Sequence, residues 1–111
     1  MPDQSQELYL RDILESGLAI QQYVKGIQFV DFVADRMRVA ATIREFEIIG
    51  EAVGKLSTDT KAQQPHLPWQ DIKDFRNLLI HEYFGVDLQI IWNVIGEELP
   101  ALRRVFNKFL D

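Results

Sequence analysis

Cysteine is absent from this chain of 111 residues. Disulfides and thiolate metal sites are therefore excluded, and the composition is compatible with a reducing compartment. No stretch approaches the ~20 apolar residues of a membrane span, since even 78–86 is interrupted by His81 and Glu82. The first residues carry neither the basic region nor the apolar core of a secretory signal. We therefore expect a cytoplasmic protein without membrane association.

Positive charge is also scarce, because 12 lysines and arginines face 17 aspartates and glutamates, for a net charge of −5. This is the wrong sign for a protein that holds nucleic acid along a broad surface. If RNA is bound, the contact must be local. Two groups of cations are candidates for such a contact, or else belong to ordinary solvated helix faces. These groups are Arg36, Arg38 and Arg44, and Arg103, Arg104 and Lys108.

Several common catalytic patterns are missing. The sequence has no glycine-rich phosphate loop and no Gly-x-Ser-x-Gly motif. The two histidines, His66 and His81, lie fifteen residues apart, and no carboxylate spacing completes a metal site with them. We therefore expect neither a metal ion nor a cofactor. The length and the 47% hydrophobic content indicate one globular domain over residues 1–111.

Apolar residues recur in steps of three and four along the whole chain, which predicts helices rather than strands. The first helix should run over 5–24, with Gly26 ending it. The same spacing resumes over 29–56, either as one long helix or as two helices with a break near 40–42. Residues 57–68 contain two prolines and several polar residues, and they should form the main connection, with room for one helical turn.

The second half of the chain should hold the remaining helices. One begins at Trp69, directly after Pro68, and Gly85 lies at its expected end. Asp87 is a suitable N-cap for a helix over 88–99, and Pro100 should kink the chain or restart it as a last helix over 101–110. We predict an all-α, up-and-down bundle of four or five helices.

The stretch 76–83 brings together an arginine, an asparagine, a histidine and a tyrosine, namely Arg76, Asn77, His81 and Tyr83. Arginine holds phosphate well, and histidine can carry a proton near neutral pH. At about 100° per residue, a helix places Arg76 and Tyr83 on one side and His81 about 140° away from Arg76. Either the helix loosens near His81, or two copies face each other across a twofold axis. We favour the second arrangement and expect a homodimer.

The spacing Arg-x4-His-x-Tyr, with asparagine directly after the arginine, resembles the signature of the HEPN superfamily of ribonucleases. Flanking segments strengthen the resemblance and are similar to the HepT subgroup, whose members are toxins encoded beside MntA, a minimal nucleotidyltransferase antitoxin. These segments are Ile48-Ile-Gly-Glu-Ala52, Leu67-Pro-Trp69, Tyr83-Phe-Gly-Val-Asp87 and Trp92. The similarity extends over about 32–102.

The resemblance implies a metal-independent endoribonuclease that cuts RNA by attack of the 2′-hydroxyl. Arg76 and His81 would be the catalytic residues, with Asn77 in support. Glu51 would orient one of them from the preceding long helix, where Gly50 permits a close approach. Tyr83 would position the RNA or accept AMP from an MntA-like partner, which would neutralise the toxin.

Other interpretations of the same residues remain open. Arg76 could pair with Asp74 or Glu82, His81 could lie in an interface, and Tyr83 could pack against the core. The protein would then be a non-catalytic helical adaptor or nucleotide-binding partner of a nucleotidyltransferase, or a purely structural dimer. The acidic net charge favours the adaptor over the ribonuclease.

Overall fold

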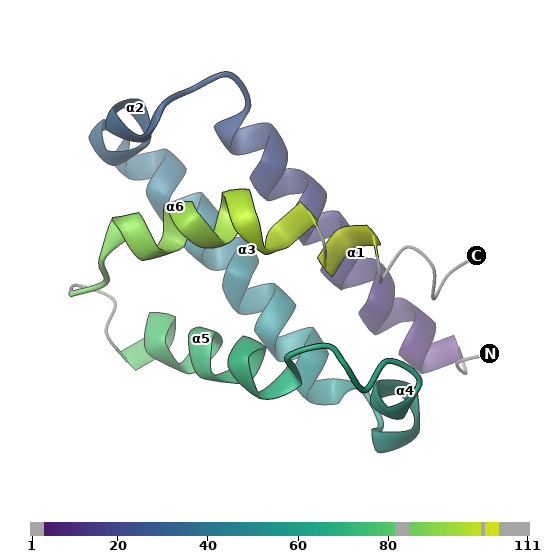
Figure 1. Ribbon diagram of the computed structural model, residues 1–111. Coiled ribbons are helices and arrows are strands. Elements are labelled where there is room, and N and C mark those ends of the chain that lie inside the picture. The colour runs from purple at the N-terminus through teal and green to yellow at the C-terminus, as the bar shows by residue number, and fades with distance from the viewer. Residues whose placement is uncertain (1–3, 82–84, 101, 105–111) are drawn as a thin grey trace.

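The computed structural model describes residues 4–81, 85–100 and 102–104, and these residues contain helices and no strand. The helices follow one another as shown in Figure 1. Their bounds are α1 Gln4–Val24, α2 Phe29–Ala34, α3 Arg36–Lys55, α4 Thr58–Ala62, α5 Trp69–His81 and α6 Leu88–Glu97. None of these helices is long and apolar enough to cross a membrane.

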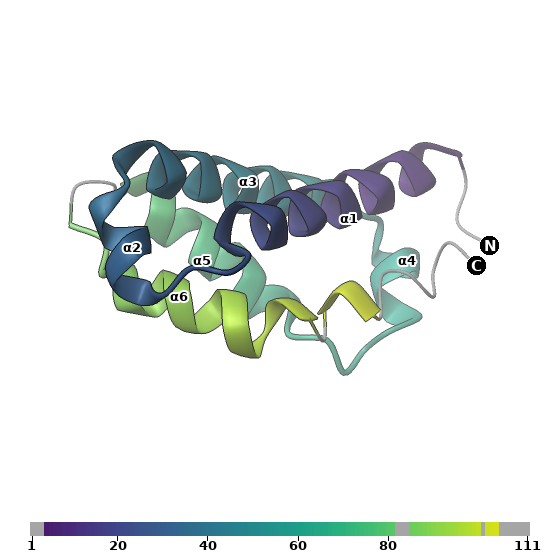
Figure 2. The same ribbon diagram turned by 90° about the horizontal axis from the view of Figure 1, so that it is seen from above.

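The four longer helices form two layers. The helices α1 and α3 run antiparallel in one layer, and α5 and α6 lie beneath them in the other, which Figure 2 shows from above. Apolar stripes of all four helices meet between the layers, as the helical spacing requires. The fully buried side chains include Leu10, Ile20, Phe32, Leu79, Ile91 and Leu99. The predicted all-α bundle is confirmed, and the pairing of two copies stays a prediction.

Helix ends follow the capping residues in the sequence. Gly26 adopts a φ of +75°, the left-handed conformation that stops a helix at low cost for glycine alone. The Asp87 carboxylate accepts a hydrogen bond of 2.9 Å from the backbone N–H of Gln89 and so caps α6. The short helix α4 is the helical turn expected within 57–68.

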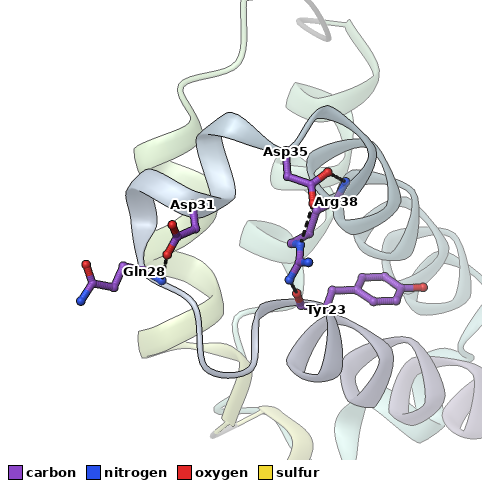
Figure 3. A network of polar contacts seen from close by, with 5 residues as sticks. All are labelled: Tyr23, Gln28, Asp31, Asp35 and Arg38. Carbon is purple, nitrogen blue, oxygen red and sulfur yellow. Dashed lines mark hydrogen bonds and ion pairs between the residues drawn. The ribbon is translucent and has the colours of Figure 1, made fainter.

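The break in the long second segment lies at Asp35, and not near 40–42 as predicted. The backbone of Asp35 is extended, and its carboxylate accepts a hydrogen bond of 3.1 Å from the N–H of Arg38, which makes Asp35 the N-cap of α3. The Arg38 guanidinium pairs with the same carboxylate and donates to the backbone carbonyl of Tyr23 (Figure 3). The end of α1 is thereby fastened to the start of α3.

The end of the chain also differs from the prediction. The helix expected over 88–99 ends at Glu97, with a turn at Glu98, and residues 99, 100 and 102–104 are again helical. The break therefore precedes Pro100 by two residues. Proline lacks an N–H group, and its ring clashes with the turn before it, so the interruption falls upstream of the ring. Of the last helix expected over 101–110, residues 101 and 105–110 lie outside the described residues.

The cap at Asp35 should make stability depend on pH. Hydrogen bonds from the backbone and then the side chain of Arg38 lower the pKa of Asp35 in the folded protein. Its contribution is complete above the unfolded carboxyl pKa of about 3.9 and is lost as the pH falls through the lower folded pKa. Asp35→Ala should lower the melting temperature at pH 7 and have a smaller effect below pH 3. The exposed Asp12, changed to alanine, is the control, and an effect of Asp35→Ala that ignores pH would contradict this assignment.

Candidate functional site

The site begins where α5 crosses α3. Phe75 of α5 packs edge-on against Phe46 of α3, with ring centroids 5.2 Å apart and ring planes at 85°. The next residue, Arg76, is half-buried, and its aliphatic stem lies against Gly50 of α3. An aromatic pair of this geometry stabilises the contact by about 0.5–1.5 kcal/mol beyond its buried area. The crossing therefore fixes the register in which Arg76 meets α3.

Gly50 makes this crossing possible. A Cβ atom at this position would lie 2.3 Å from both the Cβ and the Cγ of Arg76, a separation that nonbonded carbons do not reach. Gly50 is buried, and the stem of Arg76 occupies the space that a side chain at position 50 would need. The sequence prediction that Gly50 permits a close approach is confirmed, and the residue that approaches is the arginine of the signature.

The guanidinium of Arg76 has few partners among the described residues. Its Nε is buried and has no hydrogen-bond partner among the described residues. Its Nη1 donates to the Asn77 side-chain oxygen over 3.4 Å, at the long end for such a bond. Asp74, one of the partners considered from the sequence, instead accepts from Gln70 over 2.9 Å. The group therefore has donors left for an anionic ligand.

His81 is the last residue of α5, and its side chain is exposed. It is carried on the same helix as Arg76, five residues later, so the straight helix points the two side chains in different directions, about 140° apart. Tyr83, the third member of the signature, lies outside the described residues. The structure therefore places Arg76 and Asn77 together, and places His81 apart from them within one copy of the chain.

Glu51 lies one residue after Gly50 and takes part in an ion pair with Arg44. The nearest atoms, Glu51 Oε1 and Arg44 Nη1, are 3.6 Å apart, and both side chains are well exposed. An exposed pair of this kind contributes at most about 1 kcal/mol and holds neither partner firmly. The predicted role of Glu51 in orienting Arg76 or His81 stays a prediction.

Apolar side chains are exposed around the end of the bundle that carries His81. Figures 1 and 2 both show α2, the last turn of α5 and the first turn of α6 at this end. These elements and the first turn of α3 leave large apolar side chains in contact with solvent, most of all Met37, which is 84% exposed. The others are Val30, Val33, Leu78, Ile80 and Ile90. Apolar surface is therefore available at this end for burial against another protein.

A wide cavity between α3, α5 and α6 is lined by none of the described signature residues. It encloses about 530 Å³, and its walls are mainly apolar. The charged side chains in its lining are Asp71, Glu97 and Glu98, which would repel a phosphate. Within the described residues, no group of three or more histidines or carboxylates lies close enough to hold a metal ion. Among the described residues, Arg76 has a guanidinium that can donate hydrogen bonds to an anion, and His81 is exposed to solvent.

The two tryptophans serve the packing of the bundle. Trp92 contacts Phe29 and Phe32 of α2, with ring centroids 5.9 and 5.2 Å apart. The indole N–H of Trp69 donates to the backbone carbonyl of Gln64 over 3.1 Å and so fastens the connection before α5. Both rings are partly buried against the core.

Known proteins match nearly the whole chain. The family model of ribonuclease HepT-like proteins matches residues 13–109. A protein of Thermococcus cleftensis named "Probable ribonuclease HepT" is 40% identical over 100 residues, which cover 90% of this chain and 91% of the relative. A candidate RNase of Caldanaerobacter subterraneus is 42% identical over 103 residues, which cover 93% of this chain and 92% of the relative. No solved structure gives a significant match.

The family model and these relatives agree with the resemblance carried by the residues around Arg76, and with the helical bundle that presents them. The protein belongs to the ribonuclease HepT-like family.

Proposed function

We propose that this protein is an endoribonuclease that cuts RNA without a metal ion and acts as the toxin of a toxin–antitoxin pair. One observation carries the proposal. Arg76 is held across Gly50 with hydrogen-bond donors that no described residue uses, on the same helix as an exposed histidine. A fixed guanidinium and an accessible proton carrier are the groups that metal-independent phosphodiester cleavage requires, once two copies of the chain bring them together. The relatives named as ribonucleases support the same activity.

The reaction needs no group from outside the protein and its RNA. The ribose 2′-oxygen attacks the adjacent phosphorus, and the bond from phosphorus to the 5′-oxygen breaks. The 2′-oxygen loses its proton, and the leaving 5′-oxygen gains one. His81 acts as a general acid or base in these proton transfers. Arg76 stabilises the charge that develops on the phosphoryl oxygens, and Asn77 helps to position the phosphate. The products are a 2′,3′-cyclic phosphate and a free 5′-hydroxyl.

The active form in this proposal is a homodimer. Within one copy, Arg76 and His81 point about 140° apart along α5, so one phosphate cannot contact both across a straight helix. A twofold axis beside α5 would bring the arginine of one copy towards the histidine of the other. The exposed apolar side chains at the same end of the bundle, Leu78 and Ile80 among them, supply surface that such a dimer would bury.

Tyr83 is the proposed point of control. An MntA-like nucleotidyltransferase would transfer AMP from a nucleoside triphosphate to the phenol oxygen of Tyr83 and release pyrophosphate. The added nucleotide is bulky and negatively charged. It would obstruct the binding of RNA and repel its phosphates, and the enzyme would stop.

A second function is favoured by one observation, the net charge of −5. An acidic chain attracts RNA poorly at long range, which suits a non-catalytic adaptor whose helices only dock a nucleotidyltransferase or bind its nucleotide. In that case, the native chain would not cut RNA, and substitutions of Arg76 and His81 would alter only the binding of the partner.

Cleavage of RNA by the purified protein tests the proposed chemistry. His81→Ala should lower the rate by about 10²–10⁴-fold because it removes the proton carrier, and Arg76→Ala should also lower it strongly. Added chelator should have no effect. The measurement is gel analysis of a labelled RNA with identification of a 2′,3′-cyclic end. Full activity of His81→Ala, or its loss with chelator, would contradict the mechanism.

The position of Arg76 can be tested from the opposite helix. Gly50→Ala should displace Arg76, because the added Cβ overlaps its stem, and should cost about 1–3 kcal/mol of stability. Cleavage should fall by up to about 10²-fold, mainly in kcat, if a shift of about 1 Å misplaces the guanidinium. The matched control is Gly54→Ala, one turn later on α3, where an added Cβ meets nothing within 4 Å. It should leave cleavage unchanged and raise stability slightly. Equal activity of the two variants at a temperature where both are folded would contradict this role of Gly50.

Control by AMP transfer predicts a change of mass. The protein co-expressed with an MntA-like nucleotidyltransferase should gain one or more AMP groups, measured by intact-mass spectrometry. Tyr83→Phe, which lacks the acceptor oxygen, should keep the unmodified mass, while Tyr23→Phe should be modified like the native chain. An unmodified native chain, or modification retained in Tyr83→Phe, would contradict the assignment of the acceptor.

A further inference from the structure

A second arginine packs against a glycine in the same way as Arg76. Arg103 belongs to the helical residues after α6, which lie beside α1 in Figure 1. A Cβ at Gly17 of α1 would lie 3.1 Å from the Cγ of Arg103 and 3.3 Å from its Cδ, closer than ordinary contact. The Nε of Arg103 is buried and has no hydrogen-bond partner among the described residues, again like that of Arg76.

Arg103 also contacts α1 one turn after Gly17. Its Nη1 donates to the side-chain oxygen of Gln21, which lies four residues after Gly17 and therefore on the same face of the helix. Gly17 thus receives the stem of Arg103, and Gln21 holds one corner of its guanidinium. Because the side chain is fixed at two points, less conformational entropy is lost when it binds a ligand. This setting differs from the solvated helix face that the sequence alone allowed for Arg103.

A cavity of about 310 Å³ opens beside this arginine. Arg103 and the exposed Arg104 line it together with three apolar residues, Leu14, Leu18 and Pro100. Among the described residues, this lining contains two guanidinium groups and no carboxylate, in contrast to the acidic lining of the larger cavity. Two arginines side by side suit a phosphate group, which accepts several charge-assisted hydrogen bonds at once.

We propose that this cavity binds a phosphate group of the RNA strand, outside the position that is cut. Arg103 and Arg104 hold the phosphate, and the half-exposed Leu18 offers an apolar surface to the neighbouring ribose or base. The inference rests on the proposed ribonuclease function and extends it. It also accounts for RNA binding by an acidic chain, because the positive charge is gathered where the backbone of the substrate passes.

The binding of RNA can be measured without cleavage in a His81→Ala background. Fluorescence anisotropy with a labelled single-stranded RNA gives Kd at several salt concentrations. Arg104→Ala should weaken binding about tenfold, as expected for loss of a charged hydrogen bond. It should also reduce the slope of log Kd against log salt by about 0.7, the value for one phosphate contact on a single strand. Arg103→Gln should act in the same direction, with its folding checked by circular dichroism.

The control variant is Arg11→Ala in the same background. Arg11 is an exposed arginine of α1 that pairs with Glu7 at 2.9 Å and lines no part of the cavity, so its loss changes the net charge equally. Equal effects of Arg104→Ala and Arg11→Ala would overturn the proposed subsite. So would an effect of Arg104→Ala on the binding of free ATP with none on RNA. Neither result would contradict the proposed ribonuclease function. That function is tested separately on the chain with His81 intact, and it is overturned if that chain does not cut RNA.

Discussion

The crossing of α3 and α5 at Gly50 is the contact on which the candidate site depends. Without a side chain at Gly50, the stem of Arg76 can lie directly on the helix, and the edge-on contact of Phe75 with Phe46 holds the crossing in register. The position of the arginine therefore follows from the packing of two rigid helices. A guanidinium held in this way is organised before any phosphate arrives, which is how enzymes stabilise charge at little cost in reorganisation. His81 lies at the exposed end of the same helix.

The same arrangement of glycine and arginine occurs on α1, where Gly17 receives Arg103. In both places a buried Nε lies without a hydrogen-bond partner among the described residues, and burial of such a donor opposes folding. In a chain of net charge −5, the protein thus packs two arginines against glycines, although the burial of each Nε lowers the stability of the fold. In the proposed function, arginines held in this way would let an acidic protein bind an anionic substrate, because electrostatic attraction acts only over about a Debye length.

Prediction from the sequence succeeded where the signal was local. Gly26 and Asp87 ended and began helices as their capping preferences require, and the apolar stripes identified the buried faces. It failed at Asp35, because the helical spacing of apolar residues continues through the break. The decisive interaction joins the Arg38 side chain to the carbonyl of Tyr23, fifteen residues earlier, and no local pattern contains it. A carboxylate three residues before an arginine was the available signal for that cap.

The sequence by itself determined the helical class, most helix bounds, the family and the residues of the signature, because each depends on spacing along one helix or on a short motif. Tertiary structure decided which surface each arginine meets. Arg76 and Arg103 look alike as letters in the sequence, and both could be solvated. The burial of Arg76 depends on Gly50, 26 residues earlier in the chain, and that of Arg103 depends on Gly17, 86 residues earlier. Each arginine meets its glycine only when the two layers pack. Contacts between such distant positions have no periodicity, so only the folded chain reveals them.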